Sequence, residues 1–382
     1  MINHHEMDEA KLMEPSEGVV LFHPHIPAKA IEKVTKVLSG RWIGQGPLVD
    51  EFEEKFNAEF GKNTKALAVG SGTDALHLAY LLAGIKEGDE VIVPVFTCTA
   101  TNIPFLYMGA KIVFADVDPE TMNIDIDHVG RLINDKTRAV VVVHYGGLPC
   151  DMDKLQKLTS THNITIIEDA AHALGATFQG QKIGSISPYT MYSFQAIKHI
   201  TTGDGGMLLL PEDVYEKAKR LRWFGIDRTA KQMGIWENDI KEVGYKYQMT
   251  DISAAMGLAG LEEFAQTLAL RRRLFHIYEE KLSEISDVKF MGGGCTDREH
   301  AAWMCTILVD RRKNLWQKLR DSAIESGQVH YRNDRYSIFG GSVQGLFPNM
   351  DAVEEKYLVL PLHTKMNESD VIRICETIKS GW

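Results

Sequence analysis

Apolar runs separated by helix-like segments dominate the first two thirds of the chain. Strands are expected at 67–69, 90–93, 111–115, 139–143, 164–169, 189–194 and 207–210. Helices are expected at 27–38, 48–60, 74–84, 99–108 and 152–162. Several of the strands are almost continuously apolar, which is typical of strands covered on both faces. The alternation therefore predicts a wound α/β sheet with crossover helices.

The pattern changes near residue 250. A long amphipathic helix is expected from about 254 to about 285, followed by strands at 288–290 and 304–309 and a helix at 313–326. These elements suggest a second, smaller α+β domain, since 382 residues exceed what one hydrophobic core usually supports. We predict an N-terminal arm at 1–20, a large α/β domain at 21–260 and a small domain at 261–382. The arginine run at 271–273 is interpreted as a solvated face of the long helix.

Composition narrows the classes of function. The chain is 44% hydrophobic and 25% charged, as in ordinary soluble proteins, and its net charge of −10 argues against general nucleic-acid binding. Its apolar runs all fall short of 18 residues, so we expect no membrane span, and residues 1–17 lack the plan of a signal peptide. The five cysteines form no C-x-x-C pair, which fits a reducing cytoplasm and predicts no metal site.

A lysine just before a glycine-dense turn is the first candidate for chemistry. Lys198 follows the strand expected at 189–194 and precedes Gly203, Gly205 and Gly206. Such small residues let backbone or a ligand approach closely. Burial of this lysine would lower its pKa, because burial disfavours the ammonium, and the neutral amine can form a Schiff base with a carbonyl. The alternative is a surface lysine in a loop.

Two upstream segments suggest which kind of ligand this amine would bind. Asp169 ends the strand expected at 164–169, and the carboxyl ends of parallel strands are where α/β sheets bind ligands. A carboxylate in that position can keep the pyridinium nitrogen of a cofactor protonated. Residues 67–82 have the pattern of strand, glycine turn and helix, which points free N–H groups at a phosphate.

These three segments, in this order and at these separations, resemble the sugar aminotransferases of the DegT/DnrJ/EryC1/StrS family. The resemblance runs from about Leu21 to the C-terminus. It includes Gly-Gln-Gly-Pro at 44–47, Thr-x-x-Ala-Thr at 97–101, Phe-Gly-Ile-Asp-Arg at 224–228 and Met-Thr-Asp-Ile at 249–252. It implies the aspartate-aminotransferase fold (PLP fold type I), with a mixed, mostly parallel sheet in the large domain, and pyridoxal 5′-phosphate (PLP) as cofactor.

The resemblance assigns roles to individual residues. Lys198 would bind PLP covalently and act as general base and acid, and Asp169 would face the ring nitrogen. Phosphate donors are expected at Gly72, Thr73 and Ser193. His172 matches a position that carries a His or Gln against the cofactor ring or its oxygen, although a structural histidine is the alternative.

Two positions depart from the commonest family pattern. Cys98 stands where many members have an aromatic residue stacked on the cofactor ring, so stacking would come from elsewhere, His172 being one candidate. Lys246 stands where many members have an asparagine that reaches the phosphate in the partner subunit. A lysine there can also bind phosphate. In that case two chains build each active site and the protein is a homodimer; the alternative is an exposed loop lysine.

The resemblance also implies the substrates. The amino group would pass from L-glutamate to a keto-sugar, most often a 3- or 4-keto-deoxysugar linked to a nucleoside diphosphate, in the synthesis of amino sugars for lipopolysaccharide or other surface polysaccharides. Trp42, in a loop that the family places beside the active site, is one candidate substrate contact. His330 and Arg332 are two more, since Arg332 can pair with a carboxylate or phosphate. A surface tryptophan and a charged surface turn are the alternatives.

Other functions remain open at this level. A free keto-sugar acid of the 8-oxo-octulosonate type is another possible substrate, because the Arg and His residues at 330–335 would suit its carboxylate. Some family members carry histidine in place of the lysine and are dehydratases, but here Lys198 stands at the motif position and His199 follows it. A non-catalytic PLP-binding regulator is another alternative. A dinucleotide-binding oxidoreductase is weakly suggested by Gly70-x-Gly72, which lacks the third glycine and the ribose-binding acid.

Overall fold

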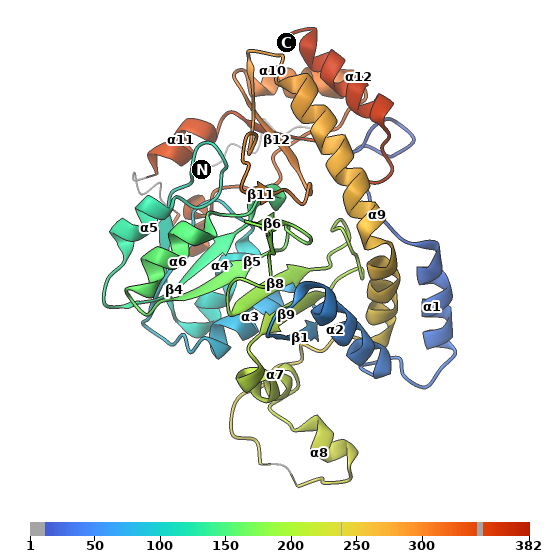
Figure 1. Ribbon diagram of the computed structural model, residues 1–382, viewed down its shortest axis with the longest axis vertical. Helices are drawn as coiled ribbons and strands as arrows, with labels where there is room; N and C mark the ends of the chain where they lie inside the picture. Colours follow the sequence, from blue (N-terminus) through green and yellow to red (C-terminus); the bar gives the residue numbers. More distant parts are fainter. Residues whose placement is uncertain (1–11, 238, 342–346) are drawn as a thin grey trace.

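A seven-stranded sheet forms the centre of the larger part of the protein in the computed structural model, which describes residues 12–237, 239–341 and 347–382 (Figure 1). In spatial order the strands are β1 (Lys65–Val69), β9 (Gly206–Leu210), β8 (Tyr189–Ser193), β5 (Thr165–Asp169), β4 (Thr137–Val143), β2 (Glu90–Pro94) and β3 (Lys111–Ala115). Strand β9 runs antiparallel to both of its neighbours, and all other neighbouring pairs are parallel. The predicted mixed, mostly parallel sheet is therefore confirmed.

Helices cover both faces of this sheet. One face packs on α2 (Pro47–Phe60), α5 (Ile126–Leu132), α6 (Met152–Ser160) and the first half of α9 (Asp251–Leu282). The other face packs on α3 (Gly72–Leu82), α4 (Thr99–Met108) and α7 (Tyr215–Arg222). Successive residues of β4 alternate between the two cores, Val140 in one and Val141 in the other. This double burial explains why the strands are apolar at nearly every position.

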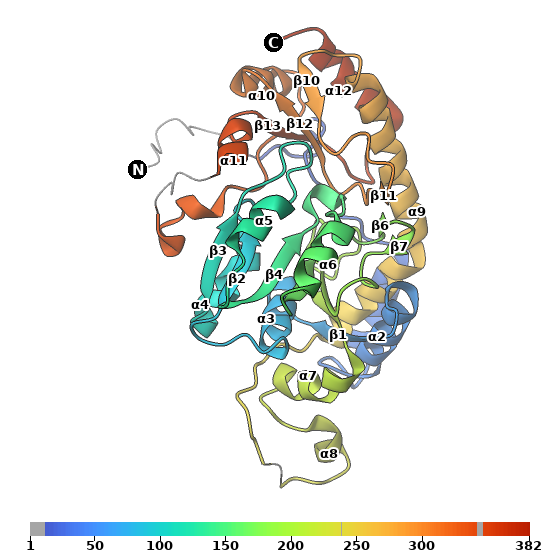
Figure 2. The same ribbon diagram turned by 60° about the vertical axis from the view of Figure 1, so that its left-hand side comes forward.

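A smaller antiparallel sheet lies at the other end of α9. Its strands are β10 (Val288–Phe290), β12 (Cys305–Val309) and β13 (Tyr357–Leu360), and they pack with α10 (Arg312–Asp321) and α12 (Glu368–Lys379). Figures 1 and 2 show α9 running along one side of the molecule between the two parts. The boundary expected between 260 and 261 falls inside this helix, whose Phe264 joins the large core and whose Leu274 joins the small one.

The remaining elements are short or connect the parts already described. They are α1 (Ala28–Leu38), β6 (Thr177–Phe178), β7 (Gln181–Lys182), α8 (Arg228–Gln232), β11 (Arg298–Glu299), α11 (Pro348–Val353) and 3₁₀ turns at Tyr145–Gly147, Glu212–Val214, Asn333–Arg335 and Ser337–Phe339. Of the N-terminal arm expected at 1–20, residues 1–11 lie outside the described part. Among the described helices, none combines the length and apolarity needed to cross a membrane.

The segments at 223–237 and 239–247, which we call the arm, project from the large domain below α7 and carry α8 (Figures 1 and 2). Its backbone returns to the body where Lys246 pairs with Trp223 and Gln248 pairs with Val69. Large apolar side chains are exposed along it, including Trp236 at 74% and Val243 at 77%. An exposed apolar segment of this kind is typical of a surface that binds another protein.

Candidate active site

Lys198 and Asp169 lie at the same edge of the central sheet. Asp169 is the last residue of β5, and Lys198 follows the end of β8, the parallel neighbour of β5. Because parallel strands end at one edge, the two side chains come close enough for each charge to shift the pKa of the other. The structure thus brings the two predicted residues together.

A hydroxyl group and a backbone N–H group hold the Asp169 carboxylate in place. Thr101, in the first turn of α4, donates from Oγ1 to Oδ2 of Asp169 at 2.8 Å, and the Thr97 hydroxyl lies 2.9 Å from that of Thr101. The backbone N–H of Ala171 donates to Oδ1 at 3.1 Å. Burial raises the pKa of Asp169, whereas these hydrogen bonds and the charge of Lys198 favour the carboxylate. Sequence reasoning did not identify Thr97 or Thr101 as site residues, although their spacing of four places both at one helix start.

The Lys198 amine is partly withdrawn from water. Burial lowers its pKa to about 7, although the nearby Asp169 and Cys98 act in the opposite direction. Its Nζ lies 3.5 Å from the centre of the Trp303 ring, in cation–π geometry. A substantial fraction of this amine is therefore neutral near pH 7, as a nucleophilic or proton-transferring lysine requires.

A column of stacked rings forms the wall beside Lys198. The His172 ring lies parallel to that of Trp303, with ring centres 3.9 Å apart, and parallel to that of His330 at 5.2 Å. Burial lowers the pKa of His172 well below its usual range, and the charge of Lys198 adds to this effect. Nδ1 of His172 is buried without a hydrogen-bond partner among the described residues. The structure therefore places His172 and His330 in the site, but His172 already stacks on a protein ring.

Trp303 is held in this wall by a buried arginine. Arg271 donates from Nε to the Ala302 carbonyl and from Nη2 to the Trp303 carbonyl, each at 3.1 Å. Arg272 donates to the His300 and Gly175 carbonyls. The prediction of a solvated face at 271–273 is thus wrong for the first two arginines, because the loop before β12 folds back over the helix. It fits only Arg273, which is exposed.

The residues predicted to bind phosphate come together where β1 leads into α3. A methyl group added at Gly72 would lie 3.2 Å from Cβ and 3.4 Å from Oγ of Ser193, so a side chain there would crowd Ser193. The Ser71 hydroxyl caps the Asp74 N–H, and the N–H groups of Gly72 and Thr73 precede it in the first turn. Backbone donors and the Ser193 hydroxyl thus gather at one helix N-terminus, as an anion requires.

Arg332 does not have the role expected of it. Its guanidinium is fully buried and donates to Asp334 at 2.7 and 2.9 Å, to Glu354 at 3.1 Å and to Asp351. Three carboxylates therefore occupy its donors, and a substrate carboxylate or phosphate would have to displace one of them. This geometry argues against the predicted substrate contact, because the ion pairs of Arg332 instead join the turn at Asn333–Arg335 to α11 and its C-cap Glu354.

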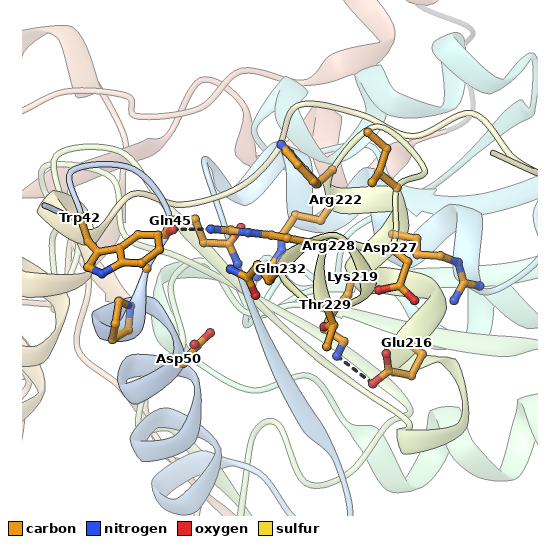
Figure 3. Close-up of a pocket in the computed structure, with 15 residues that line it drawn as sticks. Trp42, Gln45, Asp50, Glu216, Lys219, Arg222, Asp227, Arg228, Thr229 and Gln232 are labelled. Carbon is orange, nitrogen blue, oxygen red and sulfur yellow. Dashed lines mark hydrogen bonds and ion pairs between the residues drawn. The ribbon is translucent and has the colours of Figure 1, made fainter. Parts of the chain in front are cut away.

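Two other predicted residues, Trp42 and Lys246, lie away from the Lys198 wall, whereas Cys98 is close enough to affect the pKa of Lys198. Trp42 lines a cavity of about 170 Å³ at the base of the arm, and neither Lys198 nor Asp169 lines it (Figure 3). Lys246 is exposed on the arm, with its Nζ 5.3 Å from the centre of the Phe224 ring. Cys98 is exposed and directly precedes α4. Roles for Trp42 and Lys246 remain predictions.

Known proteins resemble this chain in sequence and in structure over nearly its whole length. The sequence model of the DegT/DnrJ/EryC1/StrS aminotransferase family matches residues 24–379. The GDP-perosamine synthase of Escherichia coli O157:H7 is 33% identical over 94% of this chain and 97% of its own. The UDP-4-amino-4-deoxy-L-arabinose–oxoglutarate aminotransferase of Shewanella sediminis is 31% identical over 95% and 98%. The PLP form of Spr1654, a sugar aminotransferase from Streptococcus pneumoniae, superposes with a TM-score of 0.88 at 28% identity and covers 95% of this chain and 98% of its own.

Proposed function

The chain belongs to the DegT/DnrJ/EryC1/StrS aminotransferase family, and we propose that it transfers the amino group of L-glutamate to a keto-sugar linked to a nucleoside diphosphate. It is a sugar aminotransferase of a family that uses PLP. The observation that carries the proposal is the pair of relatives whose names specify a GDP-linked and a UDP-linked amino sugar. The name of the second also specifies oxoglutarate, the product that glutamate leaves after giving up its amino group. A role in surface polysaccharide synthesis follows as part of the proposal.

The residues at the sheet edge fit PLP. Gly72 and Ser193 form a cradle that a side chain at position 72 would fill, and this suits the phosphate. Asp169 is a buried carboxylate fixed from two sides, and Nδ1 of His172 is a buried polar atom still without a partner. We assign the phosphate to Gly72, Thr73 and Ser193, the ring nitrogen to Asp169 and the covalent bond to Lys198. When bound, PLP supplies the carbonyl group that takes up nitrogen and a ring that withdraws electrons.

The residues of the chain then have defined tasks. Nζ of Lys198, neutral in part because of its lowered pKa, accepts the proton from the α-carbon of the amino donor and later delivers a proton to the sugar carbon that gains nitrogen. Asp169 holds a negative charge where the ring nitrogen would lie, in an orientation set by Thr101. The Trp303 and His172 rings keep water from one side of the amine.

The arm supports a homodimer with shared sites. It exposes large apolar side chains, and Lys246 is exposed where the arm rejoins the body, as expected for a segment that packs on a partner. Mixing Lys198→Ala chains with Lys246→Ala chains tests this proposal, because one site of each heterodimer regains both lysines. Random mixing should restore about a quarter of wild-type activity, since half of the dimers are mixed. Activity no higher than that of the parent variants would refute the shared site.

A cytoplasmic location is part of the proposal. All five cysteines are free thiols in the structure, and three of them are buried. Unpaired cysteines fit a reducing compartment.

The structure weakens the free keto-sugar acid as a substrate. That alternative depended on the Arg and His residues at 330–335, but Arg332 is paired with three acids and Arg335 is paired with Glu354. The test is direct: the enzyme is given ¹⁵N-labelled L-glutamate and a panel of keto-sugars, and mass spectrometry follows the label. We expect ¹⁵N in a nucleotide-linked amino sugar. Label that appears only in a free sugar acid, or in no sugar, would contradict the proposal.

A further inference from the structure

The cavity at the base of the arm contains polar groups that lack partners. It lies between the loop that carries Trp42, the start of α2, and the segment from α7 to α8. Nη1 of Arg228, Nε1 of Trp223 and Oε1 of Gln45 are buried there without hydrogen-bond partners among the described residues. Unpaired buried donors and acceptors cost free energy, so a site that keeps three of them together is suited to a polar ligand.

Arg228 is the cation that this cavity leaves available. Its Nη2 donates to the Gln45 carbonyl at 2.5 Å, which fixes the guanidinium across the cavity, as Figure 3 shows. Within the described ranges no carboxylate lies within 4 Å of it, and Asp50 and Asp251 act on it only from farther away. The Asp251 carboxylate already accepts from the N–H groups of Gly46, Leu48 and Val49.

The other cations beside the cavity already have acidic partners. Lys219 pairs with Glu216 at 2.8 Å, and Arg222 pairs with Glu53 at 2.5 Å. Arg228 therefore differs from its neighbours in having a positive charge and a free N–H group that no acid of the described chain satisfies. A planar guanidinium with free donors matches phosphate oxygens.

The size and the opening of the cavity limit its ligand. A volume of about 170 Å³ suits a diphosphate but not a whole nucleotide, so a ribose and base would extend outward. Trp42 stands at this opening with 44% of its surface exposed, and its indole lies on the wall opposite Asp227 (Figure 3). Aromatic rings in such positions stack on nucleobases.

We propose that this cavity binds the nucleoside diphosphate of the sugar substrate, with Arg228 on phosphate oxygens and Trp42 against the base. The inference rests on the proposed function, because it names where the nucleotide of that substrate is held. Trp223, in the cavity wall, pairs along the backbone with Lys246. In the proposed dimer the arm carries Lys246 to the partner's cofactor, so the cavity at its base lies beside the partner's site.

Binding of UDP and GDP to the PLP-loaded enzyme, measured by titration calorimetry, tests the proposal. Arg228→Gln should weaken binding about ten-fold or more, as expected for the loss of a charged hydrogen bond. Arg228→Lys, which keeps the charge without the planar fork, should lose less. Lys231→Gln is the matched control, because it removes the same charge from the same helix without lining the cavity, and it should bind as the wild type does.

Trp42→Leu and inorganic pyrophosphate separate the base from the phosphates. Trp42→Leu should weaken UDP and GDP binding but leave pyrophosphate binding unchanged. Pyrophosphate that binds as tightly as UDP, with no effect of Trp42→Leu, would overturn the base contact. Nucleotide binding that is absent, or equal in the wild type and in a folded Arg228→Gln variant, would overturn the site itself. Label transfer from ¹⁵N-glutamate, followed in parallel, reports on the proposed function separately, so the two ideas can fail independently.

Discussion

Replacing Lys198 by methionine should stabilise the cofactor-free protein at neutral pH. Burial lowers the pKa of Lys198 from 10.5 to about 7, so the folded state disfavours the ammonium that the unfolded chain carries. At about 1.4 kcal/mol per pKa unit, full burial would cost about 5 kcal/mol. Lys198 is only half-buried, and its contact with the Trp303 ring returns about 1 kcal/mol. We therefore expect a gain of about 2 to 3 kcal/mol from Lys198→Met.

This gain should depend on pH with a definite sign. Below pH 7 the lysine is charged in both the folded and the unfolded state, so the cost of burying the ammonium is present in full. Above pH 7 the folded protein carries the neutral amine while the unfolded chain still carries the ammonium. The cost therefore falls as pH rises, and it disappears once the unfolded chain loses its proton near pH 10.5. The variant should thus exceed the wild type in stability at pH 6.5 and nearly match it at pH 10.

Urea unfolding of cofactor-free protein at the two pH values measures the difference directly. Equal protein concentrations keep any contribution from association constant. Lys246→Met is the control, because that lysine is exposed and its removal should change stability little at either pH. A Lys198→Met protein that is less stable than the wild type at pH 6.5, or whose advantage persists at pH 10, would refute the argument.

Three further predictions concern the same site. Thr101→Val removes the donor to Asp169 and should weaken PLP binding about ten-fold in equilibrium dialysis; unchanged affinity would contradict a role in fixing the carboxylate. Arg271→Met frees the Trp303 carbonyl and should lower the free energy of unfolding by about 2 kcal/mol or more in urea, and equal stability would refute the clamp. Acetylation of Lys198 in cofactor-free protein should have its midpoint near pH 7 by peptide mass mapping; a midpoint near 10 would show an unburied amine.

Apolar patterning predicted the central sheet well because its strands are buried on both faces. The seven strands all coincide with predicted runs, to within a few residues at their ends. The predicted end of the helix at 313–326 was wrong by five residues, since α10 ends at Asp321. Ala323 takes a left-handed conformation there, and its carbonyl accepts from the N–H of Val19. A pairing with a segment 300 residues away leaves no local signal in the sequence.

The parts of the site on strand ends and glycine turns were predictable, whereas the wall was not. Lys198, Asp169 and Gly72 are marked by local motifs, and the structure brings each to the expected edge. Trp303 comes from the loop before β12, more than 100 residues beyond Lys198, and reaches the site only because the smaller domain folds against the larger one. Contacts between domains depend on tertiary packing, which periodicity does not encode.

Arginine shows most clearly what sequence alone leaves undecided. Arg271, Arg332 and Arg228 have the same side chain, yet the first caps carbonyls, the second is paired with three acids, and the third keeps donors free in a cavity. What separates them is the number of acceptors that the fold places around each guanidinium. A substrate phosphate gains most from the arginine whose donors are least satisfied, because it need not displace an acid. The search for the determinant of nucleotide recognition therefore moves from the 330–335 region, where the sequence suggested it, to Arg228 at the base of the arm.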